Sequence, residues 1–393
     1  MSKRVAILGS TGSIGCNALE VIKHLGPPYR AAALSARQQI DKLIEQAEQH
    51  RPAAVAIAEA DRADDVGRLR ALGAQVYLGA GGIVEMIRRD DVDIVLSAIV
   101  GAAGVPAAFA AIEAGKTLAL ANKESLVVAG SLLVPEARRR NVNIIPVDSE
   151  HSAVFQAMQC GRLHEVSRVI LTASGGPFRS APIDQIERAT VQDALNHPTW
   201  RMGSKITIDS ATMFNKALEV IEACWLFDVA PAKVQVVIHP ESVVHSMVEF
   251  IDGSTIAQLS PPDMRTPIQY ALTYPERREG IGARLDLAQK LALNFEPPDF
   301  DRFPALRLAY QVAEMRGTAG AVLNAANEVA VGAFLTGRIR FGMISRVVEL
   351  TIRRHRLQER PTLDDLLEAD RWARATADAL IDENRAQRIE DRG

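Results

Sequence analysis

A short apolar run that leads directly into a glycine-rich turn constrains the fold of this chain more than any other feature. Residues 4–8 are mostly apolar, residues 9–15 read Gly-Ser-Thr-Gly-Ser-Ile-Gly, and a helical pattern follows over 18–25. A strand, a glycine turn and a helix in this order form a phosphate cradle, because the N–H groups at the helix start face the ligand. The spacing differs from the commoner G-x-G-x-x-G, and a tight turn with incidental glycines is the alternative. The order of the elements favours a dinucleotide site.

The end of the second predicted strand indicates which dinucleotide binds. That strand covers 31–35 and runs into Ala36-Arg37-Gln38. Many NAD sites place an acidic residue here to hold the ribose hydroxyls, whereas an arginine accommodates a 2′-phosphate. Arg37 therefore favours NADP over NAD, and a solvated arginine is the alternative.

Strand-like and helical patterns alternate through the first part of the chain. Strands separated by helices of ordinary length indicate βαβ units and a parallel sheet. Further strands are predicted at 31–35, 54–57, 75–78, 93–98, 117–121 and 142–147, with helices between them that include 38–50, 106–114 and 124–139. Later strands are predicted at 168–172, 234–238, 243–250 and 255–259, and only helical patterns remain from 304 onward.

We therefore predict an α/β fold in three domains. A Rossmann-like NADP-binding domain spans 1–147, and a central α/β catalytic domain spans 148–280. A charged, proline-bearing linker covers 281–303, and a C-terminal α-helical bundle covers 304–393. Asn324 and Asn327 lie in an otherwise apolar helical pattern of this bundle, which predicts internal hydrogen bonds.

Composition excludes several classes of function. A net charge of −3 in 393 residues predicts neither nucleic-acid nor membrane-surface binding. The three cysteines are widely scattered, which indicates a reducing compartment, and the first residues enter a strand without room for a signal peptide. The uncharged stretch 94–112 is interrupted by glycine and proline, so we expect a buried strand, turn and helix there. A cytoplasmic protein is expected.

Two predicted strands end abruptly in polar residues. The strand at 117–121 runs into Asn122-Lys123-Glu124-Ser125, and the strand at 142–147 runs into Asp148-Ser149-Glu150-His151. In open parallel sheets, ligands lie beyond the carboxyl ends of the strands. If 148–150 stays extended, its two carboxylates point the same way, and oxygen ligands suit magnesium or manganese, with Glu219 as a third ligand. A helix cap by Asp148 or Ser149 is the alternative.

Residues 197–219 carry a second group of polar residues. A strand-like run at 205–208 leads into Asp209-Ser210, which resembles a helix N-cap pair. Beyond it, Thr212, Asn215, Lys216 and Glu219 recur at helical spacing and share one face. A helix start of this kind suits a phosphate, whereas a surface helix with one Lys-Glu pair is the alternative.

Two loops complete the set of candidate binding segments. Ser174-Gly175-Gly176 follows a predicted strand and can present backbone N–H groups to a second phosphate. The loop 197–203 combines proline and glycine with Trp200 and Met202. These large side chains either plug the core or form a lid over a ligand.

Taken together and in this order, the motifs at 9–15, 121–125, 146–151, 172–178 and 197–219 resemble the 1-deoxy-D-xylulose-5-phosphate reductoisomerase family over essentially the whole chain. The resemblance implies isomerisation and reduction of 1-deoxy-D-xylulose 5-phosphate to 2-C-methyl-D-erythritol 4-phosphate in the non-mevalonate isoprenoid pathway. It also implies NADPH and a divalent metal (Mg²⁺, Mn²⁺ or Co²⁺) as cofactors, a small sugar phosphate as substrate, and a homodimer. The departures are small: Phe214 and Ala217 stand where the family usually has methionine and glycine, and Ala36 where glycine is common.

The resemblance also implies a role for each matching residue. Asp148, Glu150 and Glu219 would bind the metal and act in catalysis with Lys123 and His197. The implied NADPH contacts are Thr11, Gly12, Ser13, Ile14, Arg37, Gln38, Asn122, Glu124 and Gly203. The implied substrate contacts are Ser174, Ser210, Asn215 and Lys216 to the phosphate, and Lys123, Ser149, Glu150, His197 and Glu219 to the rest of the molecule, under a flap with Trp200 and Met202.

Two other functions fit parts of the pattern. An ordinary NADP dehydrogenase without isomerisation needs no acidic metal cluster, so full turnover without metal would favour it. A non-catalytic NADP-binding sensor is the second alternative. The intact acidic residues Asp148, Glu150 and Glu219 and the lysines Lys123 and Lys216 argue against it.

Overall fold

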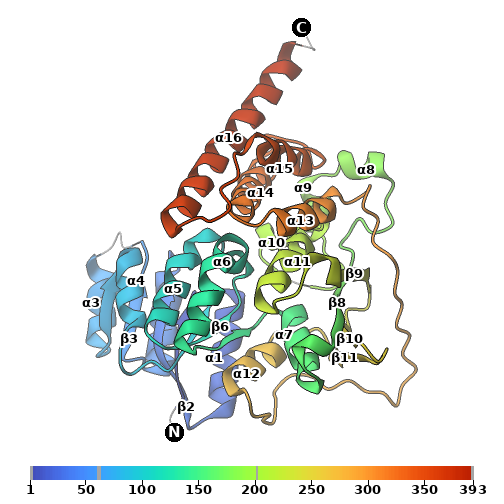
Figure 1. Ribbon diagram of the computed structural model, residues 1–393. Coiled ribbons are helices and arrows are strands. Elements are labelled where there is room, and N and C mark those ends of the chain that lie inside the picture. The colour runs from blue at the N-terminus through green and yellow to red at the C-terminus, as the bar shows by residue number, and fades with distance from the viewer. Residues whose placement is uncertain (1–2, 60–62, 201, 391–393) are drawn as a thin grey trace. The chain divides into compact units, whose positions relative to one another are not determined.

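A computed structural model describes residues 3–59, 63–200 and 202–390 of the chain (Figure 1). The chain forms two compact units that each use separate segments of the sequence. The first unit comprises Met1–Asn122, Leu133–Phe155 and Asp263–Arg284, and the second comprises Lys123–Leu132, Gln156–Pro262 and Leu285–Gly393. The predicted domain boundaries at 147, 280 and 303 stay predictions.

The first unit is built on a seven-stranded sheet in which every strand pair is parallel. The order β4-β3-β2-β1-β5-β6-β7 reverses direction between β1 and β5, which is the switch point where such sheets bind ligands. The strands are β1 (Lys3–Leu8), β2 (Tyr29–Ala36), β3 (Ala54–Ile57), β4 (Gln75–Leu78), β5 (Ile94–Ser97), β6 (Thr117–Leu120) and β7 (Ile144–Pro146).

Apolar runs make these strands the core of the first unit. Residues 5–8 of β1 are fully buried, as expected for a parallel strand that is covered on both faces. The helices of the first unit are α1 (Ser13–Leu25), α2 (Ile40–His50), α3 (Ala63–Ala71), α4 (Gly79–Ile87), η1 (Ala102–Gly104), α5 (Val105–Glu113) and α12 (Arg265–Thr273), and α6 (Lys123–Arg140) and α7 (Ser149–Ala157) contribute residues to both units.

The second unit contains a four-stranded sheet in the order β11-β10-β8-β9. β8 and β9 are parallel, and β10 is antiparallel to both β8 and β11. These strands are β8 (Val166–Ala173), β9 (Val234–Ile238), β10 (Val244–Phe250) and β11 (Thr255–Leu259). The helices before and between them are η2 (Met158–Cys160), η3 (Leu163–Glu165), α8 (Ile183–Glu187), α9 (Val191–Leu195), α10 (Ser204–Ala211), α11 (Phe214–Leu226) and η4 (Pro231–Lys233).

A helical C-terminal region completes the second unit. It consists of α13 (Pro304–Met315), α14 (Ala319–Leu335), α15 (Met343–Arg354) and the long α16 (Leu363–Glu390) (Figure 1). α14 is buried along most of its length and packs against α10, α15 and α16, while α13 packs against α11. Thr362 and Asp365 cap the start of α16, because they exchange hydrogen bonds of 2.7 and 3.2 Å.

The predicted fold class is confirmed, and one predicted strand is wrong. Residues 205–208, with Ile206, Thr207 and Ile208, lie in helix α10. Their β-branched side chains favour a strand locally, but burial of Thr207 and Ile208 decides in favour of the helix. The short helices α8 and α9 were not predicted.

The uncharged stretch 94–112 forms β5, η1 and α5, as predicted. Among the residues that the structure describes, no helix has both the length and the apolar character required to cross a membrane.

Candidate active site

The glycine turn lies at the switch point of the first sheet, between β1 and α1. Gly9 has φ +77°, and a Cβ there would lie 2.8 Å from the carbonyl oxygen of Ala98. A Cβ on Gly15 would lie 2.4 Å from Cα of Ser10, so helix and turn touch backbone to backbone. Gly12 precedes the first turn of α1 and supplies no side-chain cap. The N–H groups of that turn, at Ser13 and Ile14, are left for an anion.

Arg37 and Gln38 lie just past the end of β2 and share one acidic partner. Nε of Arg37 donates to Oε1 of Glu59 at 2.6 Å, and Nε2 of Gln38 donates to Oε2 at 2.9 Å. Hydrogen bonds from Arg37 and Gln38 lower the pKa of Glu59. Glu59 follows β3 and was not among the predicted residues, although polar residues at the ends of β6 and β7 were predicted by the same rule.

Asn122 lies two residues past the end of β6 in the first unit, and hydrogen bonds hold its side chain in place. Its Nδ2 donates to the carbonyl oxygens of Ile99 and of Gly101, the latter at 3.0 Å. A Cβ on Gly104 would lie 3.0 Å from Nδ2 of Asn122, so a larger residue there would displace the amide by a few tenths of an ångström. The amide of Asn122 is therefore part of a fixed loop at the carboxyl edge of the sheet.

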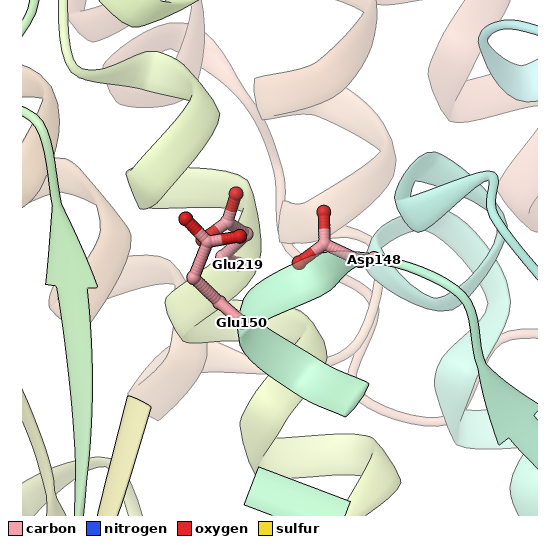
Figure 2. A group of neighbouring side chains, drawn as sticks. All are labelled: Asp148, Glu150 and Glu219. Atoms are coloured by element: carbon pink, nitrogen blue, oxygen red, sulfur yellow. The ribbon is translucent and has the colours of Figure 1, made fainter. Parts of the chain in front are cut away.

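Asp148, Glu150 and Glu219 form an acidic cluster (Figure 2). Each contributes one carboxylate oxygen, and the three oxygens lie within 4.8 Å of one another. The expectation that 148–150 stays extended is wrong, because Ser149 starts α7. Asp148 precedes that helix and accepts a hydrogen bond of 3.4 Å from the backbone N–H of His151. The alternative prediction, in which Asp148 caps the helix, is therefore correct for the local backbone. Ser149 Oγ donates to Glu150 Oε2 at 2.6 Å.

Glu219 on α11 is fully buried and is surrounded by cationic and amide groups of the second unit. Lys123 Nζ donates to Glu219 Oε1 at 2.7 Å and to Asn215 Oδ1 at 2.9 Å. Asn215 Nδ2 donates to the same Glu219 oxygen at 2.6 Å, and Lys216 Nζ donates to Glu219 Oε2. Two nearly buried ammonium groups therefore form ion pairs with this carboxylate.

A second cluster of the same unit joins two serine hydroxyls through an imidazole. His197 Nδ1 accepts hydrogen bonds from the N–H groups of Thr199 and Trp200 at 3.1 and 2.9 Å. His197 Nε2 therefore carries the ring proton, and it lies 3.0 Å from Ser210 Oγ and 3.3 Å from Ser174 Oγ. Burial lowers the pKa of His197, which favours this neutral form.

The turn after Ser174 depends on glycine, as its sequence suggested. Gly175 and Gly176 have φ +83° and +64°, and a Cβ on Gly176 would lie 2.7 Å from the carbonyl oxygen of Ser210. The N–H of Gly176 donates to Ser174 Oγ at 3.3 Å. Phosphate binding at these hydroxyls stays a prediction. The proposed helix cap at Asp209-Ser210 is wrong, because α10 continues to Ala211 and Met213, at φ +63°, precedes α11.

Trp200, Met202 and Gly203 lie in irregular backbone that leads into α10. Trp200 and Met202 are half-buried, and Gly203 is exposed. Their roles as a lid and as a cofactor contact stay predictions. The structure also joins Lys205, Asp209 and Asn327 in a largely buried group that the sequence did not indicate.

A parallel sheet with a glycine cradle at its switch point, in a chain that also carries a cluster of acidic side chains, defines a dinucleotide-dependent α/β oxidoreductase. Family models match residues 5–130, 144–227 and 259–376, and they are described as 1-deoxy-D-xylulose 5-phosphate reductoisomerase, its C-terminal domain and the DXP reductoisomerase C-terminal domain.

Curated relatives match over the full length. The chain is 50% identical to 1-deoxy-D-xylulose 5-phosphate reductoisomerase of Chlorobaculum tepidum over 381 residues, which cover 96% of this chain and all of that protein. It is 50% identical to the same enzyme of Heliobacterium modesticaldum over 388 residues, 98% of this chain and 99% of that protein. The chain therefore belongs to the 1-deoxy-D-xylulose 5-phosphate reductoisomerase family and is an NADP-dependent oxidoreductase.

Solved structures agree with this assignment. A DOX-P reductoisomerase in complex with NADPH, fosmidomycin and magnesium has a TM-score of 0.91 at 41% identity and covers 97% of this chain and 98% of its own. The Zymomonas mobilis enzyme in complex with NADPH also has a TM-score of 0.91 at 41% identity, and covers 97% of this chain and 99% of its own.

Proposed function

We propose that this chain converts 1-deoxy-D-xylulose 5-phosphate to 2-C-methyl-D-erythritol 4-phosphate, with NADPH as the hydride donor and a divalent metal such as Mg²⁺, Mn²⁺ or Co²⁺. The observation that carries the proposal is the acidic cluster, whose three carboxylate oxygens lie within 4.8 Å of one another in a member of this family. An ordinary dehydrogenase needs no such cluster.

Asp148, Glu150 and Glu219 fit a hard divalent cation. Their donor atoms are all carboxylate oxygens, which magnesium and manganese prefer, and their spacing brings them to one point. A metal bound there would act as a Lewis acid on the carbonyl and hydroxyl oxygens of the substrate during the carbon rearrangement. The residues themselves fix the position of that charge and keep it beside the bound substrate.

Lys123 and Lys216 each form an ion pair with the Glu219 carboxylate. A divalent cation would compete with both ammonium groups for the Glu219 oxygens, because like charges repel at this distance. We propose that the ammonium groups then bind the substrate, Lys123 at its hydroxyl groups and Lys216 at its phosphate. Metal binding and substrate binding are thereby coupled through one carboxylate.

Ser174, Ser210 and Asn215 would hold the substrate phosphate with Lys216. The neutral His197 ring keeps the two serine hydroxyls together and can donate its Nε2 proton to the substrate. Ser149 would contact the carbon chain. A phosphate held away from the reacting carbons supplies orientation energy for the chemical step, and closure of the segment with Trp200 and Met202 would exclude water.

The cradle of the first unit fits the cofactor. Close backbone contacts at Gly9 and Gly15 leave room for a pyrophosphate at the start of α1, near Thr11, Gly12, Ser13 and Ile14. Arg37 and Gln38 would bind the 2′-phosphate. Asn122, Glu124 and Gly203 would contact the remainder of NADPH, which supplies the hydride when bound.

We propose a homodimer in the cytoplasm. The segment 285–303 has no helix, and several large apolar side chains on it are exposed. A second copy of the chain would bury them. These side chains are Leu287, Leu291, Leu293, Phe295 and Phe300. Light scattering should give twice the chain mass of 42.6 kDa. The three free thiols support a reducing compartment.

The experiment that tests the function is NADPH oxidation with 1-deoxy-D-xylulose 5-phosphate, with and without magnesium, followed by identification of the product. We expect turnover that requires both the sugar phosphate and the metal, and a branched polyol phosphate as product. Full reductase turnover after complete metal removal would refute the proposal in favour of an ordinary dehydrogenase. Tight NADPH binding without turnover would indicate a sensor instead.

A further inference from the structure

Asp209 is a buried carboxylate of the second unit that no step of the proposed reaction uses. It lies on α10, its side chain is only 2% exposed, and it accepts a hydrogen bond of 2.8 Å from Nδ2 of Asn327 on α14. On its other oxygen it pairs with Lys205 Nζ at 2.6 Å, one helical turn earlier on α10. Asp209 therefore ties α10 to the helical C-terminal region.

Lys205 connects this anchored carboxylate to a second one. Its Nζ also lies 3.4 Å from Oε1 of Glu124, near the start of α6. Burial alone would lower the pKa of Lys205, but the charges of Asp209, Glu124 and Glu328 raise it, so the ammonium stays charged. One cation thus lies between two carboxylates, each of which is at most 11% exposed.

We propose that Lys205 is a positioning residue that fixes the Glu124 carboxylate for the cofactor and is itself held by Asp209 and Asn327. The inference rests on the proposed function, because it uses Glu124 as an NADPH contact. Without the ammonium, Glu124 would face the nearby charge of Asp209 and would turn away or bind a proton. In either case it would no longer accept the hydrogen bond for which it is placed.

Asn327 on α14 supports the same arrangement through Asp209. Among the described residues, Asn327 forms no hydrogen bond with Lys205 or Glu124, yet it donates one to the carboxylate that holds Lys205. Its neighbour Asn324 is a matched control. Both asparagines are fully buried on α14, each donates one side-chain hydrogen bond, and each has an Oδ1 without a partner among the described residues. Asn324, however, donates to Glu328.

The test is direct binding of NADPH, measured by its fluorescence without substrate or metal, for Lys205→Met, Lys205→Arg, Asn327→Leu and Asn324→Leu. We expect Lys205→Met to weaken NADPH binding about tenfold, because the cofactor loses one charge-assisted hydrogen bond. Lys205→Arg should restore most of the affinity because it keeps the charge, and Asn327→Leu should weaken binding about threefold. Asn324→Leu should bind like the wild type even where its melting temperature falls. In turnover, the KM for NADPH should rise more than the KM for the sugar phosphate.

The outcomes separate the inference from the function on which it rests. Equal NADPH affinities for the wild type, Lys205→Met and Asn327→Leu would overturn the positioning role and leave a purely structural one. Failure of the wild type itself to bind NADPH would refute the proposed function. If Lys205→Met does not fold, the NADPH affinities of Asn327→Leu and Asn324→Leu are compared instead. Equal affinities of these two variants would also overturn the inference.

Discussion

Replacing Glu219 by glutamine keeps the shape of the side chain and removes its charge from the acidic cluster. In the structure this carboxylate is fully buried and accepts hydrogen bonds from Lys123, Asn215 and Lys216. Glutamine retains one oxygen acceptor, but its amide group donates and therefore repels the ammonium groups. Glu219→Gln thus removes a proposed metal ligand and leaves two nearly buried cations without their counterion.

Both consequences have an expected size. Removing one partner of a buried ion pair costs about 3–5 kcal/mol of unfolding free energy. Losing a Lewis-acid contribution of ~4 kcal/mol to the transition state lowers kcat about 1000-fold. NADPH binding in the absence of metal should stay within about twofold of the wild-type affinity, because the glycine cradle at Gly9 and Gly15 is unchanged.

The assay measures NADPH oxidation with 1-deoxy-D-xylulose 5-phosphate over a magnesium titration, together with NADPH affinity and unfolding free energy. The control is Glu222→Gln, which makes the same change at a side chain that is 1% exposed on the same helix. We expect turnover of Glu222→Gln to keep the magnesium dependence of the wild type. The reasoning is refuted if Glu219→Gln has the wild-type kcat and the wild-type magnesium midpoint.

Three other substitutions test the phosphate site, the cofactor preference and a structural ion pair. Ser210→Ala should raise the KM for the sugar phosphate about tenfold with a smaller change in kcat, and an unchanged KM would remove Ser210 from the phosphate site. Arg37→Met should weaken NADPH binding about 10-fold or more but leave NADH binding nearly unchanged; equal losses for both would contradict 2′-phosphate recognition. Hydrogen bonds from Arg4 hold the pKa of Asp93 below its ordinary value. The pair therefore stabilises the protein above about pH 4, and its contribution is lost as pH falls through the lowered pKa. Asp93→Asn should cost about 1 kcal/mol at pH 7 and nothing at strongly acidic pH, measured by urea unfolding; a cost that does not depend on pH would contradict it.

The local pattern of apolar residues was sufficient to predict most strands of the two sheets. The strands at 54–57, 75–78, 234–238 and 255–259 have the predicted limits, because each is an apolar or alternating run between clear turn signals. The run at 205–208 failed because its β-branched residues favour a strand locally. Burial against the rest of the second unit, together with the Lys205–Asp209 pair, stabilises a helix instead.

The residues of the acidic cluster could be predicted from the sequence, but the side chains that contact them could not. Asp148 and Glu150 follow a strand end, and that position alone marks them as candidate ligands. The contact of Lys123 with Glu219 joins residues that are 96 positions apart, and no spacing rule reaches that far. Asn327 and Asp209 are 118 positions apart, so the sequence predicted an internal hydrogen bond for Asn327 without a partner. Glu59 was within reach, because it follows strand β3.

A crystal structure with Mn²⁺ and NADPH, with anomalous scattering used to locate the ion, tests the central claim most directly. We predict one manganese ion with an oxygen of each of Asp148, Glu150 and Glu219 at roughly 2.1 Å. Lys123 and Lys216 should then have moved off the Glu219 oxygens. An ion bound elsewhere, or one that lacks any of the three carboxylates, would contradict the account.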